Sequence, residues 1–226
     1  MKNNDDEGRL RVKCLLHLVF VCIGNRNRSP FAEFFFSRLI REKDNHLVDK
    51  ISVTSAGFLP QRMKDKMVAL KIGAPDPFFG RPLALTTREV LLRHGINASD
   101  EWKTKELTPE LAEQADLIIT ALPGQKKDII ELYPIVAERI FTMREISQWE
   151  GYLLQEDYDF KKIPRDSTLW DYVEEDFDYV SNILLEMEKM LIKAYPNIIT
   201  KLGLPMDGSH VGQGDSSYAK SLSNEG

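Results

Sequence analysis

The residues best suited to chemistry in this chain lie between Cys22 and Ser29, in the run Cys-Ile-Gly-Asn-Arg-Asn-Arg-Ser. Arg28 follows Cys22 after five intervening residues, and Ser29 comes next. A thiolate is a strong nucleophile, a guanidinium grips phosphate oxygens with two parallel hydrogen bonds, and a hydroxyl can donate to a departing sulfur. This set of groups predicts a loop that holds a phosphate beside a nucleophile.

The backbone of this loop is expected to take part in binding. Gly24 and Asn25 are residue types that tolerate the left-handed conformation, which lets successive N–H groups point inward around an anion. These dipoles, with Arg28 nearby, should keep Cys22 as a thiolate at neutral pH. The candidate phosphate-binding residues are therefore Ile23, Gly24, Asn25, Arg26, Asn27 and Ser29.

The elements on either side of the loop explain how it is positioned. Leu15 to Val21 is a short apolar run typical of a buried parallel strand, and Ser29-Pro30 followed by several phenylalanines is typical of a helix start. The loop thus joins a strand to a helix, and the positive end of that helix faces the anion.

The same alternation continues along the chain. Strands are predicted near 14–22, 51–56, 116–121 and 138–142, and a closing helix near 173–195 with an apolar stripe. This order predicts an α/β fold: a flavodoxin-like, doubly wound, four-stranded parallel sheet with helices on both faces. A ligand is then expected at the carboxyl ends of the strands.

The run from Val19 to Glu33 resembles the signature of the low-molecular-weight protein tyrosine phosphatases. Residues 53–57 look like the second strand of that family, 91–96 and 107–111 like its middle section, and 115–119 like its third strand. The resemblance implies a phosphomonoester hydrolase, most simply a protein tyrosine phosphatase, which forms a cysteinyl-phosphate intermediate. It implies a phosphorylated protein or a small aryl phosphate as substrate, with Cys22 and Arg28 catalytic, and no metal or other cofactor.

The family also uses an aspartic acid that protonates the leaving oxygen, in an Asp-Pro loop before the last helix. Here Ile163-Pro164-Arg165-Asp166-Ser167 stands near that place, with Ser167 where the proline would be, and Asp166 is the predicted general acid. Asp171 is the alternative. Either residue could instead be a solvated carboxylate or a helix cap.

Two loop residues depart from the family. Asn27 replaces a second cysteine, and Arg26 stands where many tyrosine-specific relatives carry an apolar residue. Arg26 would face the substrate and favour an anionic flank or a second phosphate; the alternative is a solvated surface charge.

Composition narrows the remaining choices. A net charge of −5 without a long basic cluster argues against a nucleic-acid partner, and no apolar run is long enough for a membrane span. Cys14 lies roughly 25 Å from Cys22 along an extended strand, too far for a disulfide, and is predicted to be a core residue. We therefore expect a cytoplasmic protein. No pattern indicates an oligomeric state.

The chain is expected to form a single phosphatase-like domain over residues 13–204. Residues 1–12 are predicted to be a mobile N-terminal tail and 205–226 a disordered C-terminal tail. Insertions are predicted near 58–88 and 145–162, both following strands, so that both reach the rim of the site. Their aromatic residues either grip a phenyl ring or pack the insertions against the domain.

Three other functions share part of this pattern. An arsenate reductase uses a similar loop but needs further cysteines, and Cys14 is badly placed for that role. A sugar-transport phosphocarrier has a cysteine loop but lacks the arginine. A non-catalytic phosphate- or phosphoprotein-binding module would retain the loop without a working acid.

Overall fold

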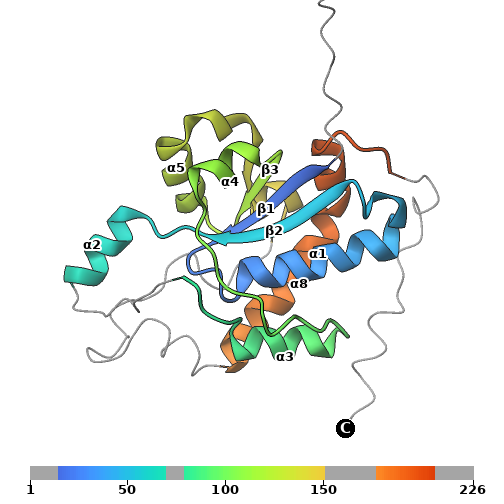
Figure 1. Ribbon diagram of the computed structural model, residues 1–226, viewed down its shortest axis with the longest axis horizontal. Helices are drawn as coiled ribbons and strands as arrows, with labels where there is room; N and C mark the ends of the chain where they lie inside the picture. The colour runs from blue at the N-terminus through green and yellow to red at the C-terminus, as the bar shows by residue number, and fades with distance from the viewer. Residues whose placement is uncertain (1–14, 70–78, 151–176, 207–226) are drawn as a thin grey trace, which may run out of the picture.

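The computed structural model describes residues 15–69, 79–150 and 177–206. Its centre is a four-stranded sheet in the order β2-β1-β3-β4, and all pairings between neighbouring strands are parallel. The strands are β1 (Leu16–Cys22), β2 (Ile51–Gly57), β3 (Leu117–Thr120) and β4 (Ile140–Thr142). Figure 1 shows the sheet between two layers of helices, which confirms the predicted doubly wound fold.

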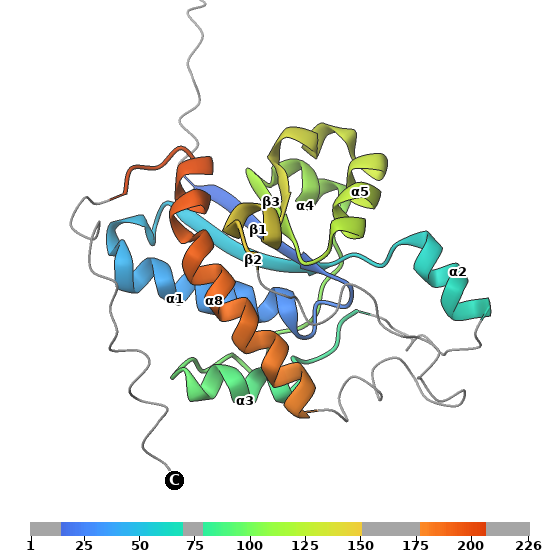
Figure 2. The same ribbon diagram turned by 180° about the vertical axis from the view of Figure 1, so that it is seen from behind.

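One layer contains α1 (Arg28–Lys43), α3 (Leu85–Arg93), α6 (Met143–Ser147) and the long α8 (Phe177–Lys201). The other contains α4 (Pro109–Gln114), α5 (Pro123–Leu132) and the 3-10 helix η2 (Pro134–Arg139). A short 3-10 helix, η1 (Asn45–Leu47), precedes β2. The helix α2 (Gln61–Ala69) stands away from both layers in Figures 1 and 2.

Each face of the sheet has its own hydrophobic core. The larger core joins β1 to α1 and α8, and Phe20, Phe31 and Phe36 are at most 1% exposed there. The smaller core joins the opposite face to α4, α5 and η2 through residues such as Val19, Ile118 and Ile129. Alternate β1 residues therefore face opposite cores, as the period of two in a strand requires.

The topology fixes the position of the loop. From β1 the chain crosses through α1 to β2, and it later returns to β3 on the other side of β1. The carboxyl end of β1 is thus the point where the direction of winding reverses, the usual ligand position in open α/β sheets. Cys22 is the last residue of this strand.

Several boundaries differ from the sequence prediction. The α8 helix does not end at residue 195: it continues through Pro196 to Lys201. Pro196 cannot donate a backbone hydrogen bond, which destabilises the helix at this point. Burial of Ile198 and Ile199 beyond it compensates for that loss, since both side chains are fully buried. The predicted insertion near 58–88 contains α2 and the start of α3.

Other predictions fall outside the described residues. These are the N-terminal tail 1–12 and Cys14, almost all of the C-terminal tail 205–226, most of the insertion 145–162, and the start of the closing helix before Phe177. Within the described parts of the chain, no helix combines the length and apolar character needed to cross a membrane.

Candidate active site

Cys22 lies at the end of β1, where it is 3% exposed and contacts the hydroxyl of Ser29. Its Sγ is 3.0 Å from Ser29 Oγ, and Ser29 Oγ is also 3.2 Å from the carbonyl oxygen of Ala56. A serine hydroxyl has one proton to donate. A neutral Cys22 can donate to Ser29 while Ser29 donates to Ala56, whereas a Cys22 thiolate would accept the Ser29 proton.

Asn25 braces the loop from inside. It is fully buried, and its φ of 53° is in the left-handed region that asparagine tolerates. Its Nδ2 donates to Ser29 Oγ at 3.0 Å and to Ser55 Oγ at 2.8 Å, and its Oδ1 accepts from the backbone N–H of Lys105 at 2.9 Å. Asn25 therefore joins the loop to β2 and to the segment before α4.

The hydrogen-bond chain continues from Asn25 to a partly buried carboxyl group. Ser55 Oγ donates to Glu33 Oε2 at 2.5 Å. Burial raises the pKa of Glu33, although the hydrogen bond from Ser55 and the charge of Lys105 act in the opposite direction. Sequence reasoning missed Glu33 and Ser55 as supporting residues. No clear signal marked Ser55 in the sequence, because β2 also contains Ser52 and Thr54, and only the structure shows that Ser55 is fully buried.

The end of the loop is fixed by α1 and α3. Arg28 is the first residue of α1, and Asn27 immediately before it accepts a 2.7 Å hydrogen bond at Oδ1 from Thr87 Oγ1. Thr87 is fully buried in α3. The N–H groups of the first turn of α1 and the half-buried Arg28 together form a positive end to the loop.

Arg26 is not a solvated surface charge. The residue is 7% exposed, and the backbone N–H of Ala84 donates to its carbonyl oxygen at 3.4 Å. Burial first, and then the positive charge of Arg81, lower the pKa of the Arg26 guanidinium. The alternative of a free surface arginine is therefore wrong.

An aromatic ring from the segment after β2 lies next to the loop. A Cβ atom at Gly57 would clash with the ring of Phe79 and would be 2.9 Å from the carbonyl oxygen of Ile23. Only glycine permits this approach. Trp149, an aromatic residue of the second predicted insertion, packs instead against the larger core. Lys193 Nζ lies 5.9 Å from the centre of its ring.

The two acid candidates, Asp166 and Asp171, lie outside the described residues. Of the predicted loop residues, the structure brings together Cys22, Asn25 and Ser29 through direct hydrogen bonds, and it places Ile23, Gly24 and Arg26 in the same buried turn. Among the described residues, no cluster of three or more His, Cys, Asp or Glu side chains could hold a metal ion.

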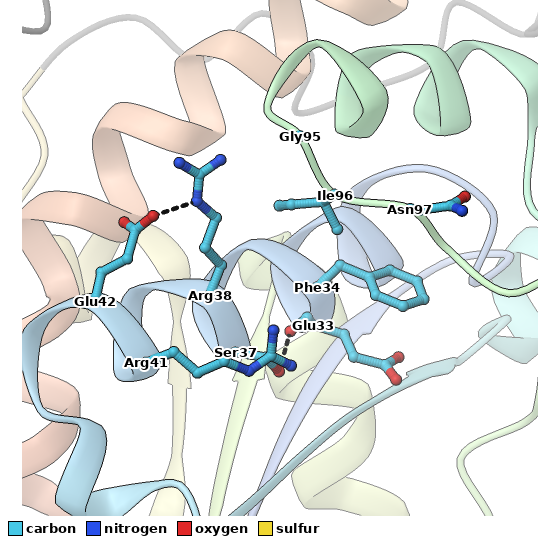
Figure 3. Close-up of a pocket in the computed structure, with 9 residues that line it drawn as sticks. All are labelled: Glu33, Phe34, Ser37, Arg38, Arg41, Glu42, Gly95, Ile96 and Asn97. Atoms are coloured by element: carbon cyan, nitrogen blue, oxygen red, sulfur yellow. Dashed lines mark hydrogen bonds and ion pairs between the residues drawn. The ribbon is translucent and has the colours of Figure 1, made fainter.

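A separate hollow of about 510 Å³ lies on the outer side of α1, under the turn that follows α3. Figure 3 shows its walls: Phe34 and Ile96 are apolar, while Arg38, which pairs with Glu42, and Arg41 are cationic. Glu33 contributes to its edge, so the hollow lies beside the last group of the hydrogen-bond chain and not at Cys22.

Comparison with known proteins agrees with this arrangement. A family model described as low molecular weight phosphotyrosine protein phosphatase matches residues 17–72. The "Probable low molecular weight protein-tyrosine-phosphatase EpsP" of Ralstonia nicotianae is 32% identical over 133 residues, covering 59% of this chain and 74% of that protein. A protein-arginine-phosphatase of Bacillus subtilis is 27% identical over 130 residues, covering 58% and 71%.

The solved structures agree on the fold. A crystal structure of a YwlE mutant from Bacillus subtilis superimposes with a TM-score of 0.54 at 22% identity, covering 81% of this chain and 98% of that one. A parallel sheet with a cysteine, arginine and serine in its first strand-to-helix loop defines a cysteine-dependent phosphatase. The chain belongs to the low molecular weight phosphotyrosine protein phosphatase family.

Proposed function

We propose that this protein is a protein tyrosine phosphatase in which Cys22 is the nucleophile. The observation that supports this most directly is the 3.0 Å contact between Cys22 Sγ and Ser29 Oγ inside a loop braced by Asn25. A hydroxyl at this distance stabilises a thiolate before attack and again when the sulfur leaves.

The proposed reaction has two steps. The Cys22 thiolate attacks phosphorus, the P–O bond to the substrate breaks, and the leaving oxygen takes a proton from Asp166. Arg28 and the loop N–H groups hold the three peripheral oxygens throughout. Water then attacks the cysteinyl phosphate, gives its proton to the same aspartate, and releases phosphate and the Cys22 thiolate. Asp171 remains the alternative acid.

The choice of phosphotyrosine over phosphoarginine is supported by one aromatic residue. The ring of Phe79 lies against Gly57, at the carboxyl end of β2 and beside the loop, where it offers an aromatic surface suited to a phenyl ring. A phosphorylated protein is the proposed partner. We place the enzyme in the cytoplasm, because the mechanism needs Cys22 to stay reduced.

The test compares phosphotyrosine and phosphoarginine peptides of matched sequence in the presence of a metal chelator. Faster hydrolysis of the phosphotyrosine peptide supports the proposal, and the opposite preference would make the protein an arginine phosphatase. Binding of both peptides without phosphate release would indicate a phosphoprotein-binding module. Asp166→Asn should slow poor leaving groups far more than nitrophenolate, and the same result for Asp171→Asn would transfer the acid role.

A further inference from the structure

We infer that the hollow on the outer side of α1 binds a small zwitterion with an apolar side chain, such as a free α-amino acid, and that the bound molecule acts on Cys22 through Glu33. The action on Cys22 rests on the phosphatase function proposed above, and it adds a regulator of the catalytic loop.

The hollow has a defined shape because the turn that covers it is tied to both α3 and α1. Gly95, with a φ of 69°, lets the chain reverse direction after α3, and the N–H groups of Gly95 and Ile96 donate back to that helix. Arg38 of α1 donates to the carbonyl oxygen of His94, just before the turn. The volume of about 510 Å³ lies within the range of small-molecule sites, about 300–1,000 Å³.

One row of α1 side chains places opposite charges on the floor of the hollow. Residues four apart lie on the same face of a helix, so Glu33, Ser37 and Arg41 form a row. Figure 3 shows Arg41 toward one end of this row and the Glu33 carboxyl group at the other. A ligand that lies along the row therefore meets a cation and an anion.

The adjacent row and the covering turn supply apolar surface. Phe34 and Ile96 line the same space in Figure 3, and the ring centre of Trp102 lies 6.2 Å from that of Phe34. A ligand with an apolar side chain and both charges can contact all three kinds of wall, whereas an apolar ligand without charges would leave Arg41 and Glu33 beside it without hydrogen bonds to it.

Both charged groups can bind a ligand. In the part of the chain that the structure describes, no carboxylate pairs with Arg41, whereas Arg38 is paired with Glu42. The Glu33 carboxyl group accepts from Ser55 and from the side chain of Trp102. Because a carboxylate has about four acceptor positions, Glu33 can also accept from an ammonium group.

Glu33 connects the hollow to the nucleophile. It accepts the Ser55 proton at 2.5 Å, which leaves Ser55 Oγ as the acceptor for Asn25 Nδ2 at 2.8 Å. The same Nδ2 donates to Ser29 Oγ, which lies 3.0 Å from Cys22 Sγ. An ionised Glu33 thus favours the arrangement in which Ser29 can donate its own proton to sulfur.

A bound ammonium group would favour the ionised form of Glu33. Burial raises the pKa of Glu33, and the positive charge of Lys105 acts in the opposite direction. A ligand cation would add to the effect of Lys105. We therefore expect the ligand to activate the enzyme at mildly acidic pH, where part of the Glu33 population holds a proton.

Binding is tested by calorimetry with saturating inorganic phosphate present, so that the catalytic loop is occupied. The probes are L-phenylalanine, 3-phenylpropanoate, which lacks the ammonium group, and 2-phenylethylamine, which lacks the carboxylate. L-phenylalanine should bind at least about tenfold more tightly than either of the others, because each of them lacks one charge-assisted hydrogen bond. Equal affinities, or no binding of any probe, would overturn the site.

Arg41→Gln should weaken binding of L-phenylalanine by about tenfold and leave binding of 2-phenylethylamine unchanged, since only the amino acid has a carboxylate for Arg41. Hydrolysis of para-nitrophenyl phosphate by this variant should equal that of wild type. Arg93→Gln is the matched control, because Arg93 pairs with Glu89 outside the hollow, and it should not change binding. Unchanged affinity for L-phenylalanine in Arg41→Gln would overturn the assignment of the carboxylate to Arg41.

The action on Cys22 is tested with kcat/KM for para-nitrophenyl phosphate at mildly acidic pH. Saturating L-phenylalanine should raise this value about threefold in wild type. Ser55 does not line the hollow, so Ser55→Ala should bind L-phenylalanine as wild type does but show no increase. No increase in wild type, or an increase that persists in Ser55→Ala, would overturn the link to Cys22.

The two proposals fail in different ways. Absence of all hydrolysis by wild type would overturn the phosphatase function and with it the action on Cys22, while calorimetry would still decide whether the hollow is a binding site. Normal hydrolysis without binding of L-phenylalanine would overturn the site and leave the phosphatase function intact.

Discussion

The Ser29 hydroxyl can donate its one proton either to the Ala56 carbonyl oxygen or to the Cys22 sulfur. Asn25 Nδ2 donates to the Ser29 oxygen, so that oxygen already accepts one hydrogen bond and its own proton is left for either Ala56 or Cys22. Ionisation of the thiol turns this proton toward sulfur. Because Asn25 is anchored by Ser55 and Lys105, the oxygen of Ser29 can stay in place while its proton changes partner.

Arg28→Lys tests the planar grip on the phosphoryl oxygens. Lysine keeps the positive charge but cannot offer two parallel donors, so kcat/KM should fall about a hundredfold or more, as for loss of another preorganised donor. The measurement is steady-state hydrolysis of an aryl phosphate. A decrease of less than about threefold, which is under 1 kcal/mol, would show that the bidentate role is wrong.

Thr87→Val tests whether α3 positions the catalytic loop. Valine has nearly the same shape but cannot donate to Asn27 Oδ1, so the residue before Arg28 loses a fixed contact. The loss of one such bond, about 1 kcal/mol, should lower kcat/KM by roughly fivefold and weaken inhibition by inorganic phosphate. Thr86→Val, at the neighbouring buried threonine, is the control. Equal effects of both substitutions would mean that only the packing of α3 matters.

At the scale of elements, the pattern of apolar residues was sufficient to predict the strands of the sheet. Apolar runs predicted all four strands to within a few residues, and the α8 stripe of Val180, Leu184 and Leu191 is buried as expected. The end of α8 was mispredicted, because tertiary burial of Ile198 and Ile199 outweighs the local preference of Pro196.

The residues that hold the catalytic loop in place could not be predicted in the same way. Cys22, Arg28 and Ser29 are close in sequence, so their spacing alone indicated chemistry. The partners of Asn25 and Asn27 are distant in sequence, since Lys105 lies 80 positions from Asn25 and Thr87 lies 60 positions from Asn27. Contacts over such separations depend on how β2, α3 and the segment before α4 pack together.

A hydrogen bond between α8 and the residue that caps the end of α1 should contribute to the stability of the fold. Tyr195 Oη donates to Asp44 Oδ2 at 2.7 Å, and both residues are buried. Tyr195→Phe leaves the carboxyl of Asp44 without this donor and should lower the free energy of unfolding by about 1–3 kcal/mol. Urea denaturation measures the loss.

Tyr133→Phe is the matched control for that experiment. Tyr133 is less buried than Tyr195 and packs at the edge of the smaller core, so loss of its hydroxyl should change stability by less than about 0.5 kcal/mol. Equal losses in the two variants would show that the contact with Asp44 adds nothing specific.

For the whole molecule, Glu33 makes stability depend on pH. Its pKa is raised in the folded state above the ordinary value of 4.5, so the folded protein holds this proton more tightly than the unfolded chain. The resulting stabilisation is present below pH 4.5 and is lost as the pH rises through the folded-state pKa. Glu33→Gln does not titrate, so the stability of wild type minus that of the variant should fall as pH rises from 4.5 toward neutrality. Urea denaturation across this range measures the difference, and a constant or rising difference would contradict the prediction.

The covalent step at Cys22 is the central claim. Enzyme that is hydrolysing para-nitrophenyl phosphate can be quenched rapidly in acid and digested, and mass spectrometry then locates any bound phosphate. We predict phosphate on the peptide that contains Cys22. The Cys22→Ser variant should still bind phosphate, but its turnover should be lowered by at least about a thousandfold, because a serine hydroxyl is a much weaker acid than a thiol. Wild-type turnover without phosphate on Cys22, together with near-normal activity of Cys22→Ser, would contradict the account.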